Sequence, residues 1–377
     1  MIDFSLTDEL RDLQQKARDF AAQEIIPIAA EYDRRGEVPM PVVEKAFEKG
    51  LLNLTVPREW GGGGYSAVAS AIVTEELAYG CAGITTTIMA NGLALTPLIL
   101  FATPEQLERF VRPFCQRPQL AAFCLTERQA GSDAGAIQTT ALPDGDDYVI
   151  NGVKCFITNG SLASLYTVFA LTSPERGPRG ASALIVPAHT PGITITKIED
   201  KMGQRASNTA EITFRDVRVP QANLLSREGR GLQVALKTLD FARAGVGALA
   251  TGLARRALDL AVSYAKERQQ FGVPIMQQQM IQQILADIAM KVEASRLLTW
   301  QAAWMVDQGM RVSRESAMAK CFAADVAMEA ATQAVQVFGG YGYMRDYPVE
   351  KLMRDAKLIQ IYEGTNQIQR VVIARHL

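Results

Sequence analysis

The segment LAAFCLTERQAGSDAG, residues 120–135, lies where the residue pattern of the chain changes. Before it, from Thr7 to about Arg117, apolar residues recur every three or four positions, as in amphipathic helices. Beyond it, short alternating runs predict β-strands at 120–125, 148–157, 165–171, 183–186, 193–198 and 210–219. After Gly229 the helical pattern returns in long segments with polar opposite faces, which favours a helix bundle.

The sequence therefore predicts an α+β fold in three parts. We expect an N-terminal helical domain at residues 1–119, a middle β domain at 120–228 and a C-terminal helical bundle domain at 229–377. Within residues 275–308, one apolar stripe is expected to hold Met280, Ile281, Ile284, Leu285, Ile288 and Val292.

Composition and charge narrow the class of partner. Lys and Arg total 39 against 40 Asp and Glu, so no excess positive charge favours nucleic acid or anionic lipid, and a small molecule is the expected partner. Five cysteines lie far apart without a C-x-x-C pair, which argues against structural zinc and a disulfide framework. Two histidines cannot supply a three-histidine metal site, so we expect no metal.

We expect a cytoplasmic protein without a membrane span. The cysteine pattern fits a reducing compartment, and the first nine residues lack the basic and apolar stretches of a signal peptide. The longest uncharged run, 77–102, contains Asn91, Pro97 and three glycines, which makes it too polar for a lipid-facing helix. A buried helix is the prediction for this run.

Four motifs carry the functional information. The glycine-rich turn at 124–135 allows close approach to a ligand, although such a turn alone is more often only a turn. A second segment, FITNG, covers residues 156–160. Far downstream, QVFGGYGY at 336–343 is followed by IYEGTNQIQR at 361–370.

These four segments, in this order and at this spacing, resemble the acyl-CoA dehydrogenase family, and the similarity extends over essentially the whole chain. The resemblance implies an FAD flavoprotein that oxidises an acyl-CoA thioester to the trans-2-enoyl-CoA, a step of fatty acid β-oxidation. It implies an N-terminal α domain, a middle β domain and a C-terminal four-helix bundle. It also implies a homotetramer that passes electrons to an electron-transfer flavoprotein.

Glu363 matches the position of the family's catalytic base. Removal of an α-proton beside a thioester needs a carboxylate that is desolvated enough for its pKa to approach the working pH. A minority pattern in the family places the base immediately before Arg243, where this chain has Ala242. Alanine cannot accept a proton, so Glu363 is the base that the resemblance offers. By the same comparison its backbone N–H would stabilise the thioester oxygen, and hydride would pass from the β-carbon to flavin N5.

The remaining site residues are also implied by the resemblance. The positions that match FAD contacts are Leu125, Thr126, Gly131, Ser132, Phe156, Thr158, Arg268, Gln270, Phe271, Gln336, Gly340, Thr365 and Gln367. Those that match substrate contacts are Ser132, Asp240, Arg243, Tyr362 and Gly364. The segment from Arg268 to Phe271 would reach the FAD of a neighbouring subunit. Met89 and Ala90 match the deep end of the acyl pocket, where apolar residues favour an uncharged acyl tail.

Some of these residues also fit plain structural roles. Arg268 sits where an exposed helix end would be closed by Gly272, and Asp240 with Arg243 fits a helical ion pair. Phe156 stands where many relatives carry tryptophan. The phenylalanine keeps an aromatic wall beside the flavin but changes how well the flavin is shielded.

The first hypothesis is a dehydrogenase for a short or medium straight-chain acyl-CoA. A flavin-dependent oxidase or monooxygenase on the same fold, and a dehydrogenase for an acyl group on acyl carrier protein, are the alternatives. A silent flavin-binding assembly protein would lack the base or the flavin loop, and both are present.

Overall fold

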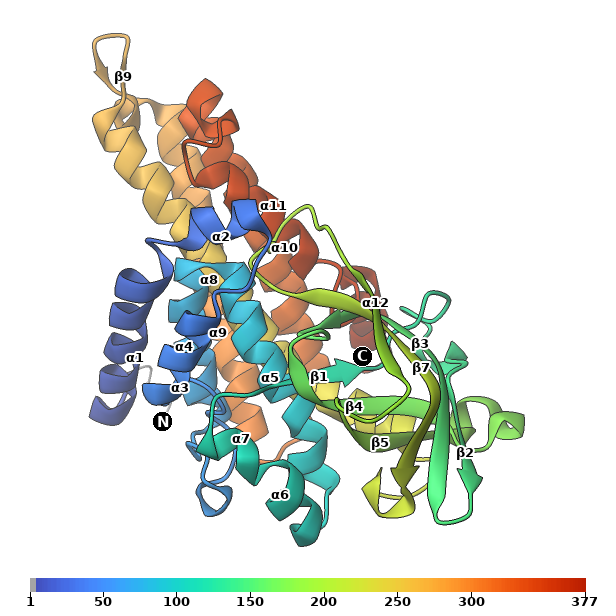
Figure 1. The fold of residues 1–377 in the computed structure, drawn as a ribbon. Coiled ribbons are helices and arrows are strands. Elements are labelled where there is room, and N and C mark those ends of the chain that lie inside the picture. Colours follow the sequence, from blue (N-terminus) through green and yellow to red (C-terminus); the bar gives the residue numbers. More distant parts are fainter. Residues whose placement is uncertain (1–4) are drawn as a thin grey trace.

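The computed structural model describes residues 5–377 and confirms the three-part α+β fold (Figure 1). Residues 1–4, which belong to the segment considered for a signal peptide, lie outside the described residues. The helical, β and helical regions follow one another in the order that the residue patterns predict.

The N-terminal region is helical. Its helices are α1 (Asp8–Phe20), α2 (Ala29–Arg35), α3 (Met40–Glu48), α4 (Ala67–Gly80), α5 (Ala82–Phe101), α6 (Pro104–Phe110) and α7 (Arg112–Gln116). Thr7 caps α1 by accepting a hydrogen bond from the Leu10 N–H, and α1 buries Leu13, Ala17 and Phe20 against the core. Amphipathic spacing therefore places α1 on the surface of this region.

The long uncharged run forms two helices instead of one. Cys81 adopts an extended conformation with φ −164°, which ends α4 and starts α5, so the predicted single helix is corrected at this residue. α5 is long and apolar enough to cross a membrane, but 61% of its most apolar window is buried inside the protein. The run is therefore buried, as predicted, and α5 packs against α4, β1 and α8.

The middle region is one eight-stranded sheet. Its strands are β1 (Leu120–Cys124), β2 (Thr140–Asp144), β3 (Asp147–Thr158), β4 (Ala163–Leu171), β5 (Ala181–Pro187), β6 (Ile193–Ile198), β7 (Thr209–Pro220) and β8 (Leu224–Leu225). The order is β6-β7-β3-β2-β4-β5-β8, and β1 pairs with β4 in parallel. All six predicted strands are confirmed, and β2 and β8 are additional.

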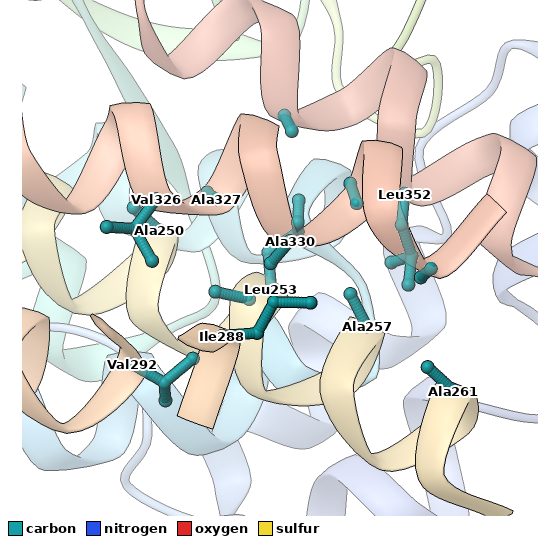
Figure 2. Close-up of a cluster of buried hydrophobic side chains, with 14 of the residues drawn as sticks. Ala250, Leu253, Ala257, Ala261, Ile288, Val292, Val326, Ala327, Ala330 and Leu352 are labelled. Atoms are coloured by element: carbon teal, nitrogen blue, oxygen red, sulfur yellow. The ribbon is translucent and has the colours of Figure 1, made fainter. Parts of the chain in front are cut away.

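The C-terminal region is a helix bundle. It contains α8 (Gly231–Glu267), α9 (Gln279–Asp307), α10 (Ser313–Phe338), α11 (Val349–Ile359) and α12 (Asn366–Ala374). α8, α9, α10 and α11 share one apolar core, in which alanines allow close helix packing. Figure 2 shows Leu253 of α8 and Ile288 of α9 beside Ala330 of α10.

One predicted core residue of the bundle is on the surface. Met280 is 70% exposed, whereas Leu285, Ile288 and Val292 are buried. Met280 lies in the first turn of α9, which begins at Gln279. The stripe therefore begins at Ile281, which packs against the core.

Candidate active site

Glu363 lies in a tight turn between α11 and α12. Glu363 has φ 52° and Gly364 has φ 88°, both in the left-handed region. The Gln369 side-chain amide donates to the carbonyls of Glu363 at 3.2 Å and Gly364 at 2.8 Å, and Thr365 caps α12 by accepting from the Ile368 N–H at 3.2 Å. A left-handed glutamate costs on the order of 1 kcal/mol, which the surrounding contacts must offset.

The carboxyl group of Glu363 is poorly solvated. Its Oε2 atom is buried and has no hydrogen-bond partner within the described part of the chain. Burial raises the pKa of Glu363 to about 7, while the positive charges of Lys320 and Arg243 act in the opposite direction. A carboxyl group with this pKa can exchange a proton near neutral pH.

Glu363 lines a mainly apolar cavity of about 350 Å³. The cavity runs between α4, α5 and α8, and along α5 its lining residues from Thr85 to Leu100 recur every three or four positions. Met89 lines the cavity as predicted. Ala90 is buried but is not among the lining residues, which corrects that expectation, because its side chain leaves α5 on another face.

Ala242, the other position considered for a base, also lines this cavity. Its methyl group can supply no proton acceptor. Of the two carboxylates that line the cavity, Asp307 accepts hydrogen bonds from the Ala67 and Val68 N–H groups, whereas Glu363 has an oxygen without a partner within the described residues. Gly92 lines the cavity too, and a Cβ atom built there has nothing within 4 Å. The cavity therefore has open space one helical turn beyond Met89.

Asp240 and Arg243 form the ion pair that their spacing predicts, with Nη1 and Oδ1 2.8 Å apart. Arg243 is 4% exposed, and its Nε atom is buried with no partner within the described residues. The Ser313 hydroxyl donates to the other Asp240 oxygen at 2.5 Å. This pair lies close enough for Arg243 to act on the Glu363 charge, so it is part of the electrostatic environment of the site.

Tyr362 belongs to a buried network that links the three regions of the chain. Its hydroxyl interacts with Thr86 of α5 and Gln204, and burial raises its pKa. Thr86 donates to the Gln204 side-chain oxygen at 2.8 Å. The Gln204 backbone N–H donates to the Asp355 carboxylate of α11 at 2.5 Å. Tyr362 is therefore fixed beside Glu363, although it is not among the residues lining the cavity.

The middle region gathers four of the predicted FAD residues. The Thr126 carbonyl accepts from the Cys155 N–H at 2.9 Å, which places Leu125 and Thr126 beside the β3 bulge that contains Phe156. Phe156 has φ 56° and is 64% exposed, and Thr158 follows at the end of β3. Bulges commonly redirect a side chain in this way.

A buried ion pair stabilises the corner of the middle region that Leu125, Thr126, Phe156 and Thr158 form. Lys154 Nζ donates to Glu127 Oε1 at 2.7 Å and to the Leu125 carbonyl at 3.0 Å, and both charged side chains are nearly inaccessible. The adjacent turn leaves Gly131 and Ser132 exposed. The corner therefore presents an aromatic face and a loop with free surface, which fits the ring of a flavin.

A second group of predicted FAD residues lines a separate cavity of about 570 Å³. Arg268, Gln270, Phe271 and Gly340 meet there, beside the hairpin of β9 (Gln269–Gln270) and β10 (Val273–Pro274). Phe271 is 93% exposed, and a forked guanidinium at Arg268 suits a pyrophosphate.

The two groups of FAD residues are far apart within one chain. Figure 1 shows the β9 hairpin at the far tip of the bundle and β3 in the sheet at the other side of the molecule. Gln336, on α10, and Gln367, on α12, are exposed and line neither cavity. A single chain therefore does not bring all of the predicted FAD contacts together.

Each of the three regions of the chain matches a domain of one protein family. The descriptions "Acyl-CoA dehydrogenase, N-terminal domain", "middle domain" and "C-terminal domain" match residues 7–117, 122–217 and 229–377. The chain belongs to the acyl-CoA dehydrogenase family. FAD is the cofactor of this enzyme family.

Relatives of this dehydrogenase cover its full length. A probable acyl-CoA dehydrogenase of Bacillus subtilis (strain 168) is 46% identical over 100% of both chains. The structure of butyryl-CoA dehydrogenase from Megasphaera elsdenii is 42% identical, with a TM-score of 0.97 over 100% of this chain and 99% of that one. A chain in a structure described as an electron transferring flavoprotein of Acidaminococcus fermentans is 45% identical, with a TM-score of 0.98 over 100% and 99%.

Two residues of the dehydrogenase site are missing from the sequence-based prediction. Lys320 contacts the Glu363 turn from α10, and Gln204 joins Tyr362 from the loop before β7. Lys320 stands in an otherwise apolar run, AMAKCFAA at 317–324, and a lone lysine in such a run is a usable signal of burial. Gln204 carries no such signal.

Within residues 5–377, no group of three or more His, Cys, Asp or Glu is placed to hold a metal ion.

Proposed function

We propose that the protein catalyses FAD-dependent α,β-dehydrogenation of a short or medium straight-chain acyl-CoA to trans-2-enoyl-CoA. The observation that carries this proposal is Glu363, a carboxyl group with a pKa near 7 at the edge of an apolar cavity. A hydrocarbon tail suits the cavity, and the carboxylate suits abstraction of the α-proton.

Glu363 works as the proton acceptor. The deprotonated carboxylate takes the α-proton, and its backbone N–H donates to the thioester oxygen as negative charge develops there. Bound FAD would supply the acceptor for the hydride that leaves the β-carbon. The apolar lining of the cavity excludes water from the carboxylate and keeps the reacting carbons aligned.

Other residues hold the cofactor and the substrate. Leu125, Thr126, Phe156 and Thr158 form the corner for the flavin, with Gly131 and Ser132 in the adjacent turn. Thr365 and Gln367 lie beyond the base and complete the cofactor site. We assign Ser132 to the CoA portion of the substrate. We assign the thioester end of the site, next to Glu363, to Asp240, Arg243, Tyr362 and Gly364.

The rate of flavin reduction is expected to rise with pH through about 7. The base must be deprotonated, and burial raises the pKa of Glu363, so the active form is lost as pH falls below that value. Stopped-flow measurement of flavin reduction by butyryl-CoA between about pH 5.5 and 8.5 checks this. A rate that is constant over that range would assign the base to a carboxylate with an ordinary pKa near 4.3.

We assign the active form to a homotetramer in which one subunit completes the FAD site of another. The two groups of FAD residues lie on opposite sides of the folded subunit, which supports this assembly. Along α9, Met290, Leu297 and Trp304 recur every seven residues and are 65%, 46% and 51% exposed. An apolar stripe of this kind favours helix packing against a second copy.

Arg268→Ala is expected to weaken FAD retention about tenfold, because a charge-assisted contact to the pyrophosphate is lost. The ratio of visible to ultraviolet absorbance after gel filtration at low protein concentration measures this. Lys266→Ala, two residues away on the exposed end of α8, is the matched control and should keep its FAD. Equal cofactor content in the Arg268→Ala variant and this control would remove Arg268 from the FAD site.

We assign electron transfer from the reduced flavin to an electron-transfer flavoprotein. Reaction of the reduced enzyme with oxygen separates this assignment from the oxidase alternative, since an oxidase reoxidises within seconds in air.

All five cysteines are free, which fits the cytoplasm as the compartment.

A further inference from the structure

Lys320 is a buried lysine behind the catalytic turn. Its side chain is fully inaccessible within α10. Its ammonium group donates to the Gly364 carbonyl at 2.9 Å and to the Asn366 side-chain oxygen at 2.9 Å. Burial of an ammonium group is costly, so a lysine in this place needs a compensating role.

The same turn is held by several contacts from two helices. Gln369 of α12 donates to the Gly364 carbonyl from a second direction, at 2.8 Å. Asn366 donates onward to the Cys321 carbonyl at 3.1 Å and to Asp325 at 2.7 Å, both on α10. Lys320 is therefore one of two donors on the carbonyl that follows the base, and it is the one that carries a charge.

The charge of Lys320 is not neutralised by its own hydrogen bonds. Both of its acceptors are uncharged, and the carboxylate that acts most strongly on it is Glu363. Burial lowers the pKa of Lys320 to about 8, so the ammonium form prevails at neutral pH.

The other charged and titratable groups around the turn are few. Arg243 with Asp240 faces it from α8, Cys321 and Asp325 lie on α10, and Tyr362 precedes Glu363. Asp325 is engaged by Arg370, Gln360 and Asn366, and Arg243 is paired with Asp240. Lys320 is thus the positive group on the α10 side of the base.

We propose that Lys320 is a positioning residue, which fixes the left-handed Glu363 turn on α10 and supplies the positive charge that keeps the base ionised for proton abstraction. This inference rests on the proposed role of Glu363. It assigns Lys320 no contact with substrate or cofactor.

Lys320→Gln tests the charge separately from the hydrogen bond, since glutamine keeps an amide donor for the Gly364 carbonyl. We expect the pH profile of flavin reduction in the holoenzyme to move upward by about one unit, so that reduction at pH 6 is about tenfold slower. Lys320→Arg keeps the charge, and its profile should remain within a few tenths of a unit of the wild type.

Gln369→Leu is the matched control, because it removes the neutral donor on the same carbonyl and leaves the charge in place. It should slow reduction equally at all pH values without moving the profile. A purely structural role for Lys320 predicts the same behaviour for Lys320→Gln, and that result would overturn the inference. If Lys320→Gln does not fold with FAD, Lys320→Met, of similar size and without charge, replaces it under the same expectation.

The pH profile of flavin reduction in the wild type and the activity of Glu363→Gln distinguish a failure of the role proposed for Lys320 from a failure of the proposed function. Loss of reduction in Glu363→Gln together with an unshifted Lys320→Gln profile would overturn only the role of Lys320. Normal reduction by Glu363→Gln would instead remove Glu363 as the base.

Discussion

Glu363→Gln is expected to reduce its flavin about 10,000-fold more slowly than the wild type when mixed with butyryl-CoA without oxygen. An amide cannot accept the α-proton, and general base catalysis contributes up to about this factor. Stopped-flow absorbance of the flavin measures the effect. FAD content and substrate binding should remain, because glutamine has nearly the same size and the rest of the cavity lining is unchanged.

The matched control for this change is Glu175→Gln, an exposed carboxylate in the loop before β5. It removes the same charge far from the cavity and should reduce flavin at the wild-type rate. A Glu363→Gln enzyme that keeps a rate within tenfold of this control would contradict the assignment of the base.

Gly92→Leu is expected to shorten the acyl chain that the enzyme accepts. The added side chain leaves α5 where a Cβ meets no atom within 4 Å and would fill the open part of the cavity beyond Met89. We expect kcat/KM for octanoyl-CoA to fall about 100-fold, the upper range for excluding methylene groups from an apolar pocket. The value for butyryl-CoA should stay within about threefold. Steady-state kinetics with the two substrates gives the ratio.

Met89→Leu is the control for Gly92→Leu, since it keeps apolar volume at the neighbouring lining position. Both substrates should then react nearly as in the wild type. If kcat/KM in Gly92→Leu fell equally for octanoyl-CoA and butyryl-CoA, the change would have damaged the fold. The cavity would then have no role in selecting chain length.

Strands could be predicted from the sequence where both faces of the strand are buried, because their residues are then almost all apolar. β4 and β5 are examples, since both carry long apolar runs and lie inside the sheet. β2 could not be predicted in this way, because Pro143 and Asp144 at its end are exposed and its position comes from pairing with β3. The break at Cys81 is likewise a tertiary feature, since the apolar pattern is continuous across it.

The site was predictable to the extent that motifs carried it. Glu363 was found from its neighbours Tyr362 and Gly364, while its left-handed backbone and raised pKa depend on burial that single residues do not reveal. Lys320 is 43 positions earlier in the chain than Glu363, so their proximity arises from the packing of α12 and its preceding turn on α10. The separation of the FAD residues into two places also becomes visible only in the folded chain.

Anaerobic mixing of the purified holoenzyme with butyryl-CoA, with the visible absorption band of the flavin recorded, tests the proposed dehydrogenation. We expect bleaching of the band and formation of the trans-2-enoyl-CoA in equal amount. A flavin that stays oxidised with butyryl-CoA and with octanoyl-CoA would contradict the proposed dehydrogenation.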